Sequence, residues 1–351
     1  MANLCITSVC NQRCDYCFAR NGPSDGGVPF MPWDRFVIAL DLVQRSGLKE
    51  ARLLGGEPTL HPEFPRMVAE VVSRDMKLLV FTNGQAPEAA LKALEAHASS
   101  VTALLNVSFS DDFTVPDVRP QQDFLRRLRE RVCLGVNLYT TRIRSLSLLL
   151  DWINTYGLAR SVRLGLAHGR IGTQNQWLRP KQYHMVAPAI LEFAIAARAS
   201  AVELSFDCGF VPCMFSSEAG QRLREMGIQL RSSCEPVLDI LPTGEIAHCY
   251  PLADLHREHL TAGMNRQMLR DRFQARFAAN RRATIFKECA ACAALQASEC
   301  TGGCLAASLS RLHCRQDAAA FAVHAPTFVS PLISSGATSN TVAGFEGAPN
   351  A

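Results

Sequence analysis

The sequence predicts an α/β fold in which a partial (β/α)6 barrel is followed by a small cysteine-rich domain. From Asn3 to about Phe206, short runs rich in β-forming residues alternate with longer amphipathic runs, which is typical of repeated βα units and a parallel sheet. After about Asp207 this alternation stops, and cysteines recur among Gly, Pro and short polar segments. The chain has 351 residues, of which 48% are hydrophobic, so it can bury one large core and a smaller appended unit.

Repeated strand–helix units account for the first part of the chain. The expected strands are Leu4–Ser8, Glu50–Leu54, Lys77–Thr82, Thr102–Phe109, Val132–Tyr139 and Ser161–Leu166. The expected helices lie near 33–46, 63–74, 87–97, 120–130, 145–155 and 181–198. Such units curve into a barrel that stays open on one side, with the strand ends at a common mouth. We therefore expect the functional residues in the loops that follow the strands.

Composition divides the chain into three segments. Residues 1–206 form the expected barrel, and residues 207–315 form a domain that we expect to be organised by metal rather than by apolar burial. Residues 316–351 are rich in Ala, Ser, Thr, Gly and Pro, with Asp317 and Glu346 as their only acids. This composition predicts a disordered tail.

Charge and targeting signals narrow the class of protein. The net charge of +4 gives too weak a bias for a nucleic-acid-binding surface. No run reaches the roughly 18 apolar residues of a membrane span, and the N-terminus lacks the regions of a signal peptide. We therefore expect a cytoplasmic protein that binds neither nucleic acid nor membrane. Its fourteen cysteines would stay reduced there, which favours metal ligands over disulfides.

Three cysteines lie immediately after the first expected strand. Cys10, Cys14 and Cys17 have the spacing CxxxCxxC. Three thiolates in one loop suit an iron–sulfur cubane with one iron free of protein ligation, and that open iron can chelate a cofactor. Cys5 is a rival ligand, but it lies within the strand and is interpreted as a small core residue. The alternative is a zinc site or a set of structural thiols.

A second motif, Gly55-Gly56-Glu57-Pro58, follows the second expected strand. Its glycines would let the backbone approach a ligand closely, and Glu57 offers an anion for an ammonium group. The motif by itself is an ordinary turn more often than a site. One βα unit after CxxxCxxC, it makes a specific combination.

With both motifs, residues 3 to 206 resemble the radical S-adenosylmethionine (SAM) superfamily in order as well as in motif. The resemblance implies that Cys10, Cys14 and Cys17 bind a 4Fe–4S cluster whose free iron chelates SAM. It implies SAM contacts for six further residues: Tyr16, Gly55, Gly56, Glu57, Ser108 and Asn137. Ser108 and Asn137 could equally be ordinary polar residues at strand ends. A reduced flavodoxin or ferredoxin would be the electron donor.

A second cysteine set occupies the C-terminal part of the chain. It comprises Cys234, Cys249, Cys289, Cys292, Cys300, Cys304 and Cys314. Four of these alone would fit a zinc ribbon, but seven are harder to explain with one zinc ion. Their order resembles the SPASM extension of radical SAM enzymes, with seven residues rather than five between Cys292 and Cys300.

The SPASM resemblance implies two auxiliary 4Fe–4S clusters. The outer cluster would be bound by Cys289, Cys292, Cys300 and Cys314, and the inner one by Cys234, Cys249 and Cys304. An upstream ligand for the inner cluster would come from Cys213, which we prefer, or from Cys208. Cys133 is interpreted as structural.

The resemblance implies reductive cleavage of SAM to a 5′-deoxyadenosyl radical that takes a hydrogen atom from the substrate. Oxidation or crosslinking of a ribosomal peptide is the first expectation, although no N-terminal peptide-binding domain precedes the expected barrel. Oxidation or epimerisation of a sugar or aminocyclitol is the second, and a non-catalytic zinc scaffold is a remote third. Sulfatase maturation is disfavoured because Tyr250 occupies the position at which sulfatase-maturing members of the family have a carboxylate that acts as a base. The catalytic acid or base remains open.

Overall fold

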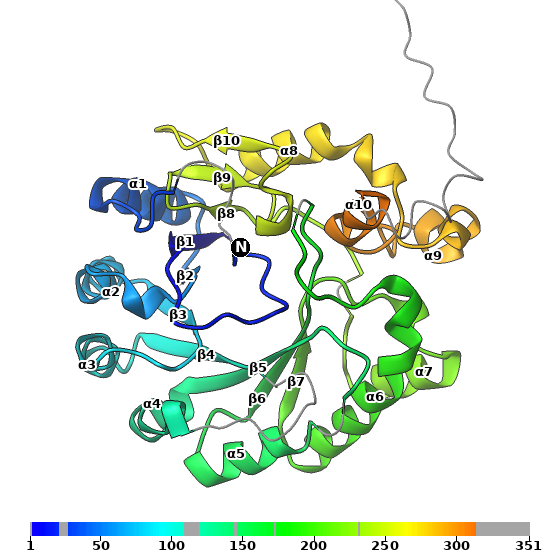
Figure 1. The fold of residues 1–351 in the computed structure, drawn as a ribbon, viewed down its shortest axis with the longest axis horizontal. Coiled ribbons are helices and arrows are strands. Elements are labelled where there is room, and N and C mark those ends of the chain that lie inside the picture. Colours follow the sequence, from blue (N-terminus) through cyan, green and yellow to red (C-terminus); the bar gives the residue numbers. More distant parts are fainter. Residues whose placement is uncertain are drawn as a thin grey trace, which may run out of the picture.

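The computed structural model describes residues 2–20, 27–108, 119–143, 146–171, 173–230 and 232–313. Its central feature is a curved sheet with the strand order β10-β9-β8-β1-β2-β3-β4-β5-β6-β7 (Figure 1). The parallel strands β1 to β7 are Asn3–Thr7, Glu50–Gly55, Lys77–Thr82, Val101–Val107, Val132–Leu138, Ser161–Leu166 and Glu203–Phe206. The six strands expected from the sequence are therefore present. β7 is a further parallel strand that the sequence analysis did not include.

Helices cover the outer face of this sheet (Figure 1). Helices α1 to α6 are Trp33–Arg45, Phe64–Ser73, Glu88–Ala96, Gln122–Leu128, Leu148–Tyr156 and Tyr183–Ala199. Each follows one parallel strand, as the expected βα units require. Helices α7 to α10 are Ser217–Glu225, Arg266–Phe277, Ala293–Gln296 and Leu305–His313. The α/β fold with a parallel, barrel-like sheet is confirmed.

The two faces of the sheet differ in polarity because side chains alternate along a strand. In β4, Ala103 and Leu105 belong to the main hydrophobic core, whereas Asn106 faces the opposite side. In β6, Val162 and Leu164 belong to that core, and Arg163 lies between them with its guanidinium over the Phe81 ring. The outer face thus packs against helices. The inside of the barrel carries the polar groups.

The sheet continues beyond the expected domain boundary. β8, Asp239–Ile240, pairs in parallel with β1, and β9, Glu245–Ala247, and β10, Arg257–His259, extend the sheet in antiparallel fashion. A hydrogen bond of 2.7 Å from Asn3 Nδ2 to Asp239 Oδ1 crosses the β1–β8 seam. The division at residues 206 and 207 therefore falls inside one continuous sheet. The expected tail, 316–351, lies outside the described residues.

Strands of two or three residues are too short to display a hydrophobic period, and β8 to β10 were therefore not expected from the sequence. Within the described part of the chain, no helix is both long and apolar enough to span a membrane.

Candidate active site

The loop that follows β1 carries Cys10, Cys14 and Cys17 at the mouth of the barrel. The thiol of Cys10 is exposed, and those of Cys14 and Cys17 are half-buried. A backbone hydrogen bond of 3.0 Å from Cys17 N to the Cys14 carbonyl closes a turn between the last two cysteines. Burial and the nearby thiols of Cys14 and Cys10 raise the pKa of Cys17 to about 11. These thiols repel one another as anions, and a cationic metal centre would offset that repulsion.

The Gly55-Gly56 turn packs directly on the start of this cysteine loop. Gly56 N donates to the Thr7 carbonyl and Glu57 N to the Val9 carbonyl, each at 2.7 Å. A Cβ atom added to Gly55 or Gly56 would lie 2.1 Å from one of these two carbonyl oxygens. The close approach predicted for the glycines is therefore present, but the backbone they approach is the chain's own. Their contact with SAM stays a prediction.

The carboxylate of Glu57 is buried, with 1% of the residue exposed. Its Oε1 accepts from Thr59 N at 3.2 Å, Thr59 Oγ1 at 2.6 Å and Thr82 Oγ1 at 2.8 Å. Its Oε2 accepts from Asn83 N at 2.7 Å. Burial raises the pKa of Glu57, while these hydrogen bonds act to lower it. The carboxylate thus accepts from the chain's own donors and positions the turn, and its contact with the SAM ammonium group stays a prediction.

Asn83, directly after β3, links Glu57 to the cysteine loop. Besides the backbone bond to Glu57, its Nδ2 donates to Asn11 Oδ1 at 2.7 Å and lies 3.9 Å from Cys10 Sγ. The sequence analysis missed this residue. Its position at the end of a parallel strand was the available signal, because strand ends meet at the barrel mouth.

Ser108, directly after β4, contacts two residues of the cysteine loop, Cys14 and Tyr16. The Ser108 hydroxyl lies 2.8 Å from the Tyr16 hydroxyl and 3.4 Å from Cys14 Sγ. The Tyr16 ring also packs against Tyr139, with centroids 5.0 Å apart. The structure therefore brings two of the predicted cofactor-binding residues together beside a predicted cluster ligand.

Asn137 lies farther round the inner face of the sheet, on β5. A Cβ added to Gly165 of β6 would come within 2.3 Å of Asn137 Oδ1. On β4, Asn106 repeats this arrangement beside Gly135, and no hydrogen-bond partner for its buried Oδ1 is found among the described residues. Asn106 was missed although it alternates with core residues in the same way as Asn137. The two amides give the barrel interior hydrogen-bonding groups near its mouth.

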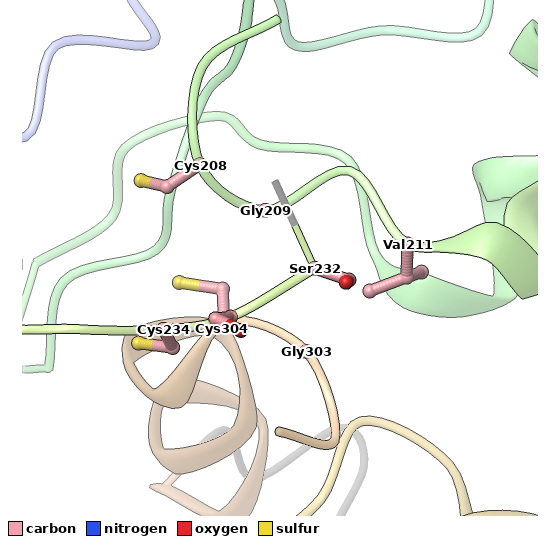
Figure 2. Close-up of a pocket in the computed structure, with 8 residues that line it drawn as sticks. Cys208, Gly209, Val211, Ser232, Cys234, Gly303 and Cys304 are labelled. Carbon is pink, nitrogen blue, oxygen red and sulfur yellow. The ribbon is translucent and has the colours of Figure 1, made fainter. Parts of the chain in front are cut away.

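A second group of thiols gathers between β7 and α10. Cys208, Cys234 and Cys304 line one small pocket, and Figure 2 shows their sulfur atoms turned to the same side. A hydrogen bond between Cys234 and Cys304 raises the pKa of the first thiol and lowers that of the second. Burial, followed by the charges of Cys234 and Cys304, raises the pKa of Cys249. These are the three predicted inner ligands, with Cys208 beside them.

Cys213 lies near other thiols. Partial burial of its sulfur, followed by the nearby thiols of Cys289 and Cys300, raises its pKa to about 11. The 3₁₀ turn Pro212–Met214 carries it, and its place in the inner set stays a prediction. Cys208, which lines the pocket with Cys234 and Cys304, is the other candidate for that upstream ligand. Cys314 lies outside the described residues.

The spacing of these thiols bears on the kind of metal centre. Across the described ranges, no three His, Cys, Asp or Glu side chains are grouped so as to hold a metal ion. One zinc ion requires its thiolates about 2.3 Å from a single point, whereas a 4Fe–4S cluster distributes them over its irons.

Comparison with known proteins gives the family. Residues 4–137 match the family model of the Radical SAM superfamily. Residues 4–137 of this chain therefore form a radical SAM domain. The matched segment runs from β1 to β5 and contains the cysteine loop, the Gly55-Gly56 turn, Ser108 and Asn137.

Two solved structures share the fold of this chain. Streptococcus suis SuiB bound to the precursor peptide SuiA has a TM-score of 0.65 at 14% identity, covering 86% of this chain and 71% of SuiB. Native anSMEcpe with bound AdoMet has a TM-score of 0.61 at 15% identity, covering 87% and 89%. At these identities the likeness shows the fold alone.

Curated relatives match shorter parts of this chain. A tungsten-containing aldehyde ferredoxin oxidoreductase cofactor-modifying protein of Pyrococcus furiosus is 40% identical over 81 residues, 22% of each chain. A GTP 3′,8-cyclase of Chlorobaculum tepidum is 28% identical over 151 residues, 41% of this chain and 45% of the cyclase. This chain therefore covers less than half the length of these relatives.

Proposed function

We propose that this protein is an enzyme that cleaves SAM reductively and takes a hydrogen atom from its substrate. The observation that carries the proposal is the three-thiol loop seated on the Gly55-Gly56 turn at the mouth of a radical SAM barrel. With Cys10, Cys14 and Cys17 as ligands, a bound 4Fe–4S cluster would supply the electron that converts SAM to methionine and a 5′-deoxyadenosyl radical.

The chain's own residues would hold and orient SAM. Three thiolates from one loop leave one iron position free for the amino and carboxylate groups of SAM. The backbone of the Gly55-Gly56 turn would lie beside that position. Glu57 holds the turn in place through the four hydrogen bonds that its carboxylate accepts. Asn106 and Asn137 offer amides inside the barrel. These groups restrict the position of the reacting carbon, and such restriction is a large part of catalysis.

Two auxiliary clusters are proposed for the second cysteine set. Gathering of the thiols favours Cys208, Cys234, Cys249 and Cys304 for the inner one. The outer one would take Cys289, Cys292 and Cys300, with Cys213 and Cys314 as candidates for the fourth ligand. Two of the inner thiols, Cys208 and Cys249, follow β7 and β9 of the same sheet, so this cluster would lie closer to the barrel and could accept an electron from a substrate radical.

A ribosomal peptide is the substrate class that we propose, with oxidation or crosslinking of a side chain as the reaction. Support comes from the shared fold, over 86% of this chain, with SuiB bound to its precursor peptide and with anSMEcpe bound to the Kp18Cys peptide. Tyr250 is buried in a small cluster with Cys5 and Leu241, so its position supplies no carboxylate of the sulfatase-maturase kind.

A small polar molecule is the second candidate. Its support is the similarity of this chain to GTP 3′,8-cyclases and to a nucleotide dehydratase of Selenomonas ruminantium, which is 36% identical over 83 residues. These matches cover at most 41% of the chain.

The decisive experiment is anaerobic incubation of the reconstituted protein with SAM and dithionite, followed by chromatography for 5′-deoxyadenosine. We expect the wild type to form it. Joint replacement of Cys10, Cys14 and Cys17 by Ala should abolish it, and the control Cys133→Ala, on β5 away from the thiol groups, should not. Stoichiometric zinc without iron, or reductive SAM cleavage by the triple variant, would refute the assignment.

A further inference from the structure

The segment between β6 and α6 donates hydrogen bonds to three backbone carbonyls of the cysteine loop. Gln176 N donates to the Asp15 carbonyl at 2.9 Å. Asn175 Nδ2 donates to the Tyr16 carbonyl at 3.0 Å, and Arg170 Nη1 to the Phe18 carbonyl at 3.0 Å. These three carbonyls flank Cys17 on both sides. The peptide units around this cysteine are therefore fixed by a part of the chain about 155 residues away.

The Asn175 amide is oriented by its own hydrogen bonds. Its Oδ1 accepts from Arg170 N at 3.3 Å and Thr173 Oγ1 at 3.1 Å, while Nδ2 also donates to the His168 carbonyl at 2.8 Å. Donor and acceptor ends are thus both assigned. Because these bonds already hold the amide in one orientation, little side-chain entropy is lost when its Nδ2 donates to the Tyr16 carbonyl.

Arg170 connects the same loop to the C-terminal part of the chain. The residue is 4% exposed, its Nε donates to Asp254 Oδ2 at 2.7 Å, and its Nη2 forms an ion pair with the same oxygen at 2.7 Å. Its guanidinium lies 5.7 Å from the centroid of the Tyr250 ring, which in turn packs on Phe18 at 5.4 Å. Tyr250 and Asp254 follow Cys249, a proposed inner ligand.

Because the Arg170 side chain is buried, the positions of its hydrogen-bond partners are tightly constrained. A guanidinium is buried at acceptable cost only when its donors are matched, and its planar fork can serve a carboxylate and a carbonyl at once. A lysine in its place offers a point charge without the fork. The geometry of the Phe18 carbonyl therefore depends on Arg170 and, through it, on Asp254.

We propose that Arg170, Asn175 and Asp254 form a clasp of positioning residues that holds the third cysteine of the first site in place and ties that site to the C-terminal segment. The proposal extends the proposed function, since it takes Cys17 to be a cluster ligand. It also implies that the two cysteine sets are not independent. A change at Asp254, which lies shortly after the proposed inner ligand Cys249, would disturb the first site.

The test compares Arg170→Lys, Asn175→Ala and Asp254→Asn with the control Arg66→Lys. Arg66 also pairs with a carboxylate, Glu63, and lies over a ring, Trp33, but it is on α2 at the outer face. In the cluster-free, reduced chain, hydrogen exchange of peptides covering residues 10–20 is measured by mass spectrometry. We expect each clasp variant to exchange there roughly tenfold faster than wild type, with no change in α2. The control should show no change at 10–20.

The second readout is SAM binding to the reconstituted proteins, followed by electron paramagnetic resonance of the reduced first cluster. We expect the SAM dissociation constant of the clasp variants to rise roughly tenfold, as for one lost charge-assisted hydrogen bond. Wild-type exchange at 10–20 in all clasp variants that fold would overturn the clasp; if Arg170→Lys does not fold, Asn175→Ala decides. Failure of the wild type to bind iron would instead overturn the proposed function, and the exchange measurement would still judge the clasp.

Discussion

Replacement of Glu57 by Gln separates a positioning carboxylate from a ligand-binding one. In the folded chain the carboxylate is buried and accepts four hydrogen bonds, three on Oε1 and one on Oε2. A glutamine amide has only one accepting atom. Whichever way it is turned, its NH2 group faces at least one of these donors, and that donor is left unsatisfied.

The size of the effect follows from these contacts. One buried donor without a partner costs about 1–3 kcal/mol, and the remaining bonds lose the strengthening that a charged acceptor gives. We therefore expect Glu57→Gln to lower the free energy of unfolding by about 2–4 kcal/mol in the absence of SAM. A residue whose task was only to bind SAM would show no such loss in the SAM-free chain.

The assay is urea unfolding of the reduced, cluster-free protein, followed by circular dichroism. Glu63→Gln is the matched control, because Glu63 has a 38% exposed side chain paired with Arg66 on the surface, where such pairs contribute little. Equal unfolding midpoints for Glu57→Gln and the control would refute the positioning role. A weaker affinity for SAM with an unchanged free energy of unfolding would instead assign Glu57 to direct contact with SAM.

Three other predictions test the site and its surroundings. Gly56→Ala places a Cβ 2.1 Å from a backbone oxygen and should prevent retention of the first cluster, measured as iron per chain, whereas Gly220→Ala in α7 should leave the iron content unchanged. Cys208→Ser should remove the inner cluster's electron paramagnetic signal while Cys213→Ser spares it; the reverse pattern would contradict the regrouping of these thiols. Burial raises the pKa of Asp239 to about 6 from 3.8, so the folded chain binds this proton more tightly than the unfolded chain, and the stability it contributes is full below about pH 4 and lost as the pH rises to about 6. The difference in unfolding free energy between wild type and Asp239→Asn should therefore change by about 3 kcal/mol across that window, and a flat difference would contradict the shift.

The features that the sequence predicted are those set by local patterns. The β-rich and amphipathic runs gave six strands and six helices because periods of two and of 3.6 residues are visible within a single element. The spacing of Cys10, Cys14 and Cys17 is likewise local, and one loop suffices to bring these thiols together. The superfamily could be predicted for the same reason, because its two motifs lie within 60 residues of the N-terminus.

Long-range packing decided the rest. Pairing of β8 with β1 joins residues 236 apart, and a two-residue strand carries no period that could announce it. The choice between Cys208 and Cys213 depended on which way the chain turns after β7, since both lie in one short run of sequence. In the sequence, Glu57 in a glycine turn is a charge available to a ligand, and only the tertiary structure shows that Thr82 and Asn83 donate to its carboxylate. The sequence alone thus determined which chemical groups the site contains, whereas the tertiary structure decided which of them face a ligand and which hold the site together, because hydrogen bonds and burial are set by residues distant in the chain.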